Sequence, residues 1–417
     1  MMMHFAAEID DALRKLMVEC KVRYKAAAVK RLYLDRSMGG LGFPSVVSVA
    51  QESVVEAAAY VLLHPQMEAV RKFHNAVRKS GKRNIISDCD AVLKGFGIQL
   101  DPEDVIVNVV DGNGGRVSFS DCRELSKMLR KQMKIVRNQE YLDEWKAMPL
   151  AGKFLQDPMV DLDASSLWLK KGATSPRVVR NIVAAQEGCL LTRACPGSGS
   201  SDKACRKCGA AMETVSHVLS HCAVWLPNLY VERHDKVARC VYYRLCEQYG
   251  LPIVHYSNQI PPCASNESVE VSWDTIIPTA GRIYHNRPDI VVYDKVKKLV
   301  LVFEFAVAFV SGLARQRLMK INRYTINSSR MDDDMDLPYP PGPNLVEELR
   351  RQYSCEVRFI PVVVGATGQV RVVLITSGTA GFGKAIGCWN PGELGQSESA
   401  LLGELTRRYV NRKYIKP

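Results

Sequence analysis

The segment 287–307 has the sequence RPDIVVYDKVKKLVLVFEFAV. Two runs rich in β-branched and aromatic residues flank a charged turn, which is typical of a β-hairpin. We expect Asp294 to pair with Leu299, because a four-residue turn and a two-residue turn at its centre give the same register. This register places Asp289 opposite Glu304, and residues directly opposed on two strands have Cβ atoms about 5 Å apart.

Two carboxylates at that separation repel each other unless a cation lies between them. Carboxylate oxygens are ligands that suit Mg²⁺ and Mn²⁺, so Asp289 and Glu304 are candidate metal ligands. Glu304 also interrupts an apolar run, and a charged, unpaired acid there would cost several kcal/mol. It therefore needs either a metal or a basic partner, and a simple salt bridge explains it equally well.

Residues 313–325 have the composition of a helix, on which Gln316, Lys320 and Tyr324 share one face. A lysine near a phosphodiester can stabilise the negative charge that develops during hydrolysis. The simpler alternative is a solvated lysine on a basic helix.

The hairpin lies in a segment, 287–375, whose pattern predicts strand, turn, strand, helix, Pro-rich loop, helix and two strands. Helical patterns dominate the first half of the chain, so we expect a multidomain α+β protein. Helices are expected at 5–36, 45–63, 122–138, 176–191 and 230–249. The expected domains are a helical segment 1–80, a basic helical linker 81–195, a Cys/His segment with its following helix 196–250, a mixed α/β domain 251–395 and a basic tail 396–417.

Composition indicates a globular chain, with 47% hydrophobic and 24% charged residues. The net charge of +12 and a pI of about 9.0 favour a polyanionic partner, nucleic acid before an anionic membrane. The run 299–310 is too short to span a bilayer and contains Glu304, and residues 1–7 do not resemble a signal peptide. With 13 scattered cysteines, we expect a reducing, nuclear or cytoplasmic location, no secretion and no membrane partner.

A compact metal-binding motif lies at 205–222. Cys205 and Cys208 form a Cys-x-x-Cys pair, and His217 and Cys222 follow one helical turn apart. This spacing predicts a tetrahedral Cys₃His zinc site, structural because protein ligands close all four positions. His221 is an alternative fourth ligand, although the cysteine is the softer choice. The alternative to a zinc site is a pair of incidental cysteines and a helix with a buried Cys222, but the tight spacing favours zinc.

A basic face is expected on the helix 122–138. It consists of Lys127, Arg130, Lys131 and Lys134. Such a face can lie along nucleic-acid phosphates, although a solvated face is the more common reason for the pattern.

Together these motifs resemble the restriction-enzyme-like endonuclease of site-specific non-LTR retrotransposons, a branch of the P-D-(D/E)-x-K nuclease superfamily. Residues 286–295 look like its first acidic motif, 304–307 like its second, and 358–365 like a later core strand. The common superfamily lysine would stand at Ala306. The retrotransposon branch moves the lysine to the next helix, with a tyrosine one turn on, and Lys320 and Tyr324 match those places.

The resemblance extends upstream of the hairpin. Residues 205–222 with 233–235 look like the zinc knuckle that precedes this endonuclease, 31–44 look like the reverse-transcriptase thumb, and 184–193 resemble the linker. A polymerase palm is not expected, because the acidic cluster 332–334 precedes a Pro-rich loop and follows no strand.

The resemblance implies a metal-dependent endonuclease that nicks DNA. Asp289 and Glu304 would hold Mg²⁺ or Mn²⁺, Lys320 would stabilise the phosphorane-like charge, and Tyr324 would orient the water or a phosphate. It also implies structural Zn²⁺, with DNA and the element's RNA as partners. The alternatives are an inactive, zinc-containing nucleic-acid-binding protein derived from such an element, and a purely structural zinc protein.

Overall fold

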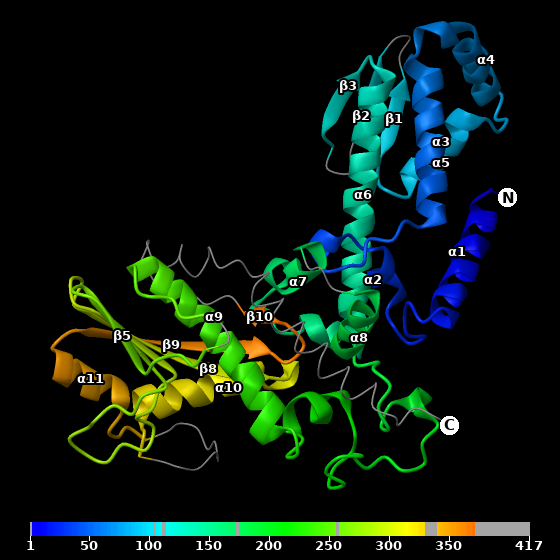
Figure 1. The fold of residues 1–417 in the computed structure, drawn as a ribbon. Coiled ribbons are helices and arrows are strands. Elements are labelled where there is room, and N and C mark those ends of the chain that lie inside the picture. Colours follow the sequence, from blue (N-terminus) through cyan, green and yellow to red (C-terminus); the bar gives the residue numbers. More distant parts are fainter. Residues whose placement is uncertain are drawn as a thin grey trace. The chain divides into compact units, whose positions relative to one another are not determined.

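The computed structural model describes residues 2–102, 106–110, 114–171, 175–255, 258–329 and 340–371. This part of the chain is mixed α+β, as expected, with a three-stranded and a seven-stranded sheet. The chain divides into two compact units, 1–147 and 148–417. Figure 1 shows the elements of each unit.

The first unit combines helices with a small antiparallel sheet of order β1-β2-β3. Its elements are α1 (Met2–Glu19), α2 (Val29–Tyr33), a 3₁₀ turn (Arg36–Met38), α3 (Val46–Leu63), a second 3₁₀ turn (Pro65–Met67), α4 (Glu68–Lys79), α5 (Ile85–Lys94), β1 (Gln99–Pro102), β2 (Val107–Val110), β3 (Arg116–Phe119) and α6 (Cys122–Ala147).

The prediction of one continuous helix over 5–36 is wrong, because the helix is interrupted after residue 19. Helix α1 ends at Glu19, and Lys21 adopts a left-handed conformation with a φ of 57°. The amide of Val22 then donates to the carbonyl of Met17 at 2.8 Å. This is the kind of backbone closure that ends helices, and here it forms without a glycine to signal it.

The core of the first unit contains residues from before and from after the expected domain boundary at 80/81. Ala58 from α3, Cys89 from α5, Val107 from β2 and Leu129 from α6 all belong to one buried cluster. Because α6 supplies part of this core, the division of the chain falls after Ala147 and not at 80/81.

Among the described residues, one helix, α3, is long and apolar enough to cross a membrane by length and composition alone. Its Val55, Ala58 and Leu62 are buried against α5 and α6 in the cluster just described. One face of α3 therefore contributes to the core of the first unit.

The second unit is built on a seven-stranded sheet of order β4-β10-β9-β8-β7-β6-β5, in which only β8 and β9 are parallel neighbours. Its strands are β4 (Val160–Asp161), β5 (Cys263–Ser265), β6 (Val269–Trp273), β7 (Ile290–Asp294), β8 (Leu299–Ala308), β9 (Glu356–Gly365) and β10 (Val370–Arg371). Its α-helices are α7 (Leu162–Lys171), α8 (Pro176–Gln186), α9 (Val231–Tyr249), α10 (Leu313–Ile321) and α11 (Leu345–Tyr353).

Short helical turns join these elements. They are 3₁₀ turns at Ala151–Leu155, Pro196–Ser198 and Val310–Gly312, and π-helical turns at His217–His221, Leu226–Tyr230 and Asn322–Ile326. The helix expected at 176–191 ends earlier, at Gln186, and Gly188 follows with a φ of 66°.

The predicted hairpin register is confirmed. Asp294 pairs with Leu299, and Ile290 pairs with Phe303. Strand β7 has no further ladder pair beyond Ile290, whereas β8 continues along β9 as far as Ala308. This leaves the backbone of β8 without a β7 neighbour from residue 304 onward.

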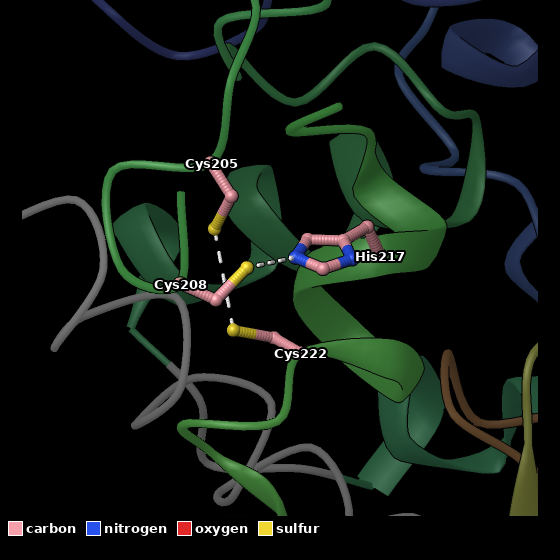
Figure 2. Close-up of side chains that lie close together, drawn as sticks. All are labelled: Cys205, Cys208, His217 and Cys222. Atoms are coloured by element: carbon pink, nitrogen blue, oxygen red, sulfur yellow. Dashed lines mark hydrogen bonds between the residues drawn. The ribbon is translucent and has the colours of Figure 1, made fainter. Parts of the chain in front are cut away.

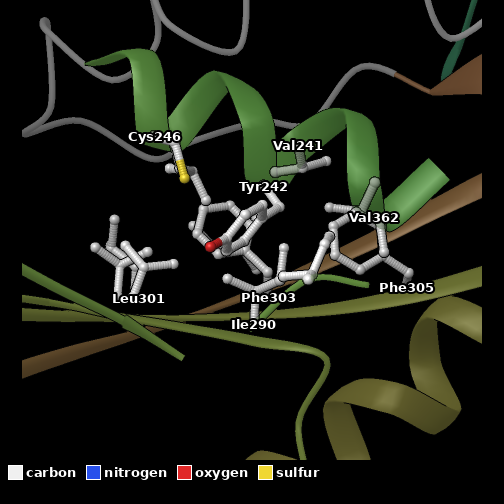
Figure 3. Packing of buried hydrophobic residues seen from close by; sticks show 14 of the residues in the cluster. Val241, Tyr242, Cys246, Ile290, Leu301, Phe303, Phe305 and Val362 are labelled. Atoms are coloured by element: carbon white, nitrogen blue, oxygen red, sulfur yellow. The ribbon is translucent and has the colours of Figure 1, made fainter. Parts of the chain in front are cut away.

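Helices cover the sheet on both faces. Phe303 and Phe305 of β8 pack against Val241 and Tyr242 of α9 (Figure 3). The alternate residue Val302 packs in a second cluster with residues of α11 and the turn after α10. Because successive strand residues point to opposite faces, α9 and α10 approach β8 from opposite sides.

Candidate functional site

Asp289 and Glu304 lie together at the open end of the hairpin, just before β7 begins at Ile290 and where β8 continues. The amide of Asp289 donates to Oε2 of Glu304 at 3.2 Å, and the amide of Phe305 donates to Oδ2 of Asp289 at 2.7 Å. These two hydrogen bonds take the place of the next ladder pair. The end of the hairpin thus concentrates two carboxylates on one short stretch of backbone.

Lys320 of α10 is the partner of Glu304. Its Nζ lies 2.6 Å from Oε1, and the side chains of Lys320 and Glu304 are 17% and 6% exposed. Burial raises the pKa of Glu304, and the charge of Asp289 adds to this effect while Lys320 opposes it. Of the two partners expected for Glu304, a metal or a base, the structure supplies the base.

His234 of α9 is a member of this site that sequence analysis missed. Its Nε2 lies 3.4 Å from Oδ2 of Asp289 and 3.3 Å from the carbonyl oxygen of Phe305. Its Nδ1 lies 3.1 Å from Oδ1 of Asp235. The only signal in the sequence was the adjacent His-Asp pair, which does not reveal which strand α9 covers.

The charges of His234 and Asp289 depend on each other. Burial lowers the pKa of His234, but hydrogen bonds to Asp235 and Asp289 outweigh it and raise the pKa to about 10. Burial raises the pKa of Asp289, but His234, the Phe305 amide and Lys320 outweigh it and lower the pKa overall. Without a metal, the site therefore holds an imidazolium beside a carboxylate.

Tyr324 closes the buried side of the same site. It is 4% exposed, its ring stacks on Phe359 with centroids 5.2 Å apart, and its hydroxyl lies 3.5 Å from the carbonyl oxygen of Arg287. Burial, with the charges of Glu304 and Asp289, raises the pKa of this hydroxyl. Tyr324 is therefore a protonated group facing the carboxylates.

The four predicted zinc ligands form one cluster, shown in Figure 2. Their ligand atoms all lie within 4.8 Å of one another. The sulfurs of Cys205 and Cys222 are 4.0 Å apart, and Sγ of Cys208 is 3.3 Å from Nε2 of His217. Tetrahedral zinc with Zn–S bonds of 2.3 Å sets sulfurs about 3.8 Å apart, so this cluster could bind a zinc ion.

Local contacts explain how the sequence builds the cluster. Gly209 turns the chain with a φ of 68° after the Cys-x-x-Cys pair. Thr214 Oγ1 accepts the amide of His217 at 3.0 Å and so begins the ligand helix. Fully buried Glu213 accepts the backbone amides of Arg193 and Arg206, which fixes the loop on either side.

Tyr230, which directly precedes α9, holds the last ligand, Cys222, in place. The hydroxyl of Tyr230 donates to the carbonyl of Val218 at 2.7 Å and accepts the amide of Cys222 at 3.1 Å. The alternative ligand His221 is exposed, with Nδ1 3.1 Å from the carbonyl of Ser216, and lies outside the cluster. The geometry therefore selects Cys222.

The basic face of α6 belongs to the first unit. Lys127 and Lys131 are exposed. Lys134 Nζ lies 2.6 Å from Oδ2 of Asp35, and Arg130 NH1 lies 3.7 Å from Oε2 of Glu56. Two of the four predicted contact residues are thus paired within the protein.

The acidic cluster 332–334 and the expected basic tail 396–417 lie outside the described residues. None of the protein-family models and none of the curated proteins compared with this chain matches it.

Proposed function

We propose that the second unit is a metal-dependent endonuclease that nicks DNA, as the endonucleases of site-specific non-LTR retrotransposons do. The observation that carries the proposal is the convergence of Asp289, Glu304 and Lys320 next to the start of β7. Two acids and a lysine at the open end of a hairpin within the sheet, in a chain with a net charge of +12, fit phosphodiester hydrolysis.

Each residue has a role that its position supports. Asp289 and Glu304 offer carboxylate oxygens to Mg²⁺ or Mn²⁺, and such an ion, when bound, supplies Lewis-acid activation of water and of the phosphate. Lys320 reaches Glu304 and stabilises charge on the phosphoryl oxygens. Tyr324, held protonated, donates a hydrogen bond to the water or to a phosphate oxygen.

The zinc cluster has a structural role in this proposal. Tyr230, which holds the cluster together, lies four positions before His234, which contacts Asp289. Zinc would thus stabilise the start of the helix that covers the nuclease site. The basic chain would supply phosphate contacts, which position DNA without reading its sequence.

A supercoiled-plasmid assay with Mg²⁺ tests the proposal. We expect the wild-type chain to nick the plasmid and Asp289→Ala to lose at least a hundredfold in rate. Glu356→Gln is the matched control, because Glu356 is an exposed acid of the same sheet that pairs only with Arg358 among the contacts described. If the wild type and Asp289→Ala nick equally slowly, the endonuclease proposal is wrong.

One observation favours the rival function, a nucleic-acid-binding protein without catalysis. Lys320 and His234 already balance the charges of Glu304 and Asp289, so the two acids are stable without a metal. This rival predicts salt-dependent DNA binding that does not require Mg²⁺ and does not change in Asp289→Ala. A purely structural zinc protein would lack the salt-dependent binding as well.

A further inference from the structure

The geometry points to His234 as a further protein ligand of the catalytic metal, next to Asp289, which makes the site selective for a transition metal such as Mn²⁺ over Mg²⁺. This inference rests on the proposed function for the presence of the metal. It adds a nitrogen ligand, which comes from a different helix. Three potential ligand atoms carry it: Nε2 of His234, Oδ2 of Asp289 and the carbonyl oxygen of Phe305.

The spacing of these atoms fits a common ion. Nε2 of His234 lies 3.4 Å from the Asp289 oxygen and 3.3 Å from the Phe305 oxygen. In an octahedral site with bonds of about 2.1 Å, neighbouring ligand atoms are about 3 Å apart. A shift of a few tenths of an ångström would therefore bring Nε2 of His234 to the spacing of neighbouring ligands from each of these two oxygens.

The Phe305 carbonyl points to the side of β8 on which β7 pairs with residues 299–303 but not with residue 305. The amide of Phe305 donates to Asp289, and the N–H and C=O of a strand residue point toward the same neighbour. Because β7 pairs with β8 only as far as Phe303, no strand of the sheet occupies the side of residue 305 toward Asp289. A metal ion can therefore reach this carbonyl oxygen.

Asp235 fixes which imidazole nitrogen faces the metal. Its Oδ1 lies 3.1 Å from Nδ1 of His234. A carboxylate on one ring nitrogen holds the proton there and leaves the other nitrogen as the ligand, an arrangement common around metal-binding histidines. The proton on Nε2, which bridges to Asp289 and Phe305 without metal, leaves on binding.

The consequence concerns which ion the site takes. Carboxylate and carbonyl oxygens alone suit Mg²⁺, whereas an imidazole nitrogen adds affinity for transition metals that Mg²⁺ does not share. A site with His234 should therefore bind Mn²⁺ more tightly than Mg²⁺. Without His234, the preference should shrink.

Electron paramagnetic resonance of the full-length, zinc-loaded protein titrated with Mn²⁺ tests this inference. We expect one bound Mn²⁺ per chain with a ¹⁴N coupling from a directly bound imidazole. His234→Ala should lose this coupling and weaken Mn²⁺ binding at least tenfold. His4→Ala, which removes an exposed histidine of α1, should change neither.

A wild-type spectrum without ¹⁴N coupling, or a coupling that persists in His234→Ala, would overturn the inference. The two proposals fail separately. If Asp289→Ala loses Mn²⁺ binding and nicking while His234→Ala binds Mn²⁺ as the wild type does, the nuclease stands without the histidine ligand. If Mn²⁺ binds through His234 but the wild type does not nick DNA, the metal site stands without the nuclease.

Discussion

Lys320 and His234 contact neighbouring carboxylates from opposite faces of one β-sheet. Lys320 of α10 reaches Glu304 at 2.6 Å, and His234 of α9 reaches Asp289 at 3.4 Å. Both contacts lie where β8 continues along β9 beyond its last pair with β7, Ile290–Phe303. Each basic group stabilises a buried acid that otherwise accepts only a backbone amide among the contacts described.

Replacing Lys320 with methionine should destabilise the protein. Glu304 would then be a buried acid without its lysine, and breaking a buried ion pair in this way costs about 3–5 kcal/mol. The double variant Glu304→Leu/Lys320→Met should recover most of that loss, because it removes the orphaned charge. Chemical unfolding of the full chain measures both free energies.

Lys236→Met is the control for this pair. Lys236 joins Glu232 on α9 in a partly exposed ion pair, which is worth at most about 1 kcal/mol. Equal losses in Lys320→Met and Lys236→Met would contradict a buried role for Lys320.

Zinc should depend on Cys222 and not on His221. We expect one zinc per purified chain, its loss in Cys222→Ala and its retention in His221→Ala, because only Cys222 lies in the ligand cluster. Chelation should also lower the melting temperature, since a structural zinc site contributes directly to folding. Metal analysis of the two variants checks the prediction, and zinc loss from both would show that His221 takes part.

Lys127 and Lys131 should contribute more to DNA affinity than Lys134. Both are exposed, whereas Lys134 is engaged by Asp35. If both contact phosphates, their joint replacement by alanine should reduce the salt dependence of binding by about 1.8 in log Kd per log salt. Lys134→Ala should change it by less. An unchanged slope in the double variant would mean that this face is only solvated.

Asp35 should make stability depend on pH in the acid range. Its hydrogen bond with Lys134 is the largest cause that lowers its pKa, from 3.8 to about 2. A lowered folded-state pKa gives stability that is complete above about pH 4 and is lost as the pH falls toward 2. Because Lys134 is 62% exposed, solvent screening limits the effect to about 1 kcal/mol.

The comparison of wild type with Asp35→Asn isolates this effect. The difference in unfolding free energy between them should shrink as the pH falls from 5 to 2. A difference that stays constant across this range would assign the role of Asp35 to its hydrogen bond with Ser37 and not to its charge.

The sequence by itself determined the features whose cause is local. Two runs rich in β-branched and aromatic residues around a charged turn set the register that brings Asp289 to Glu304. The Cys-x-x-Cys spacing and the helical spacing of His217 and Cys222 set the zinc cluster. In both cases the residues lie close along the chain, so backbone geometry alone constrains their separation.

Only the tertiary structure decided which groups from distant segments join the two acids. Residue 234 and residue 320 meet the hairpin because α9 packs on one face of β8 and α10 lies on the other. The packing of a helix depends on the apolar surface of the whole sheet, including the parallel strand β9. Such a surface exists only once strands from across the chain have assembled, so no local pattern could identify His234.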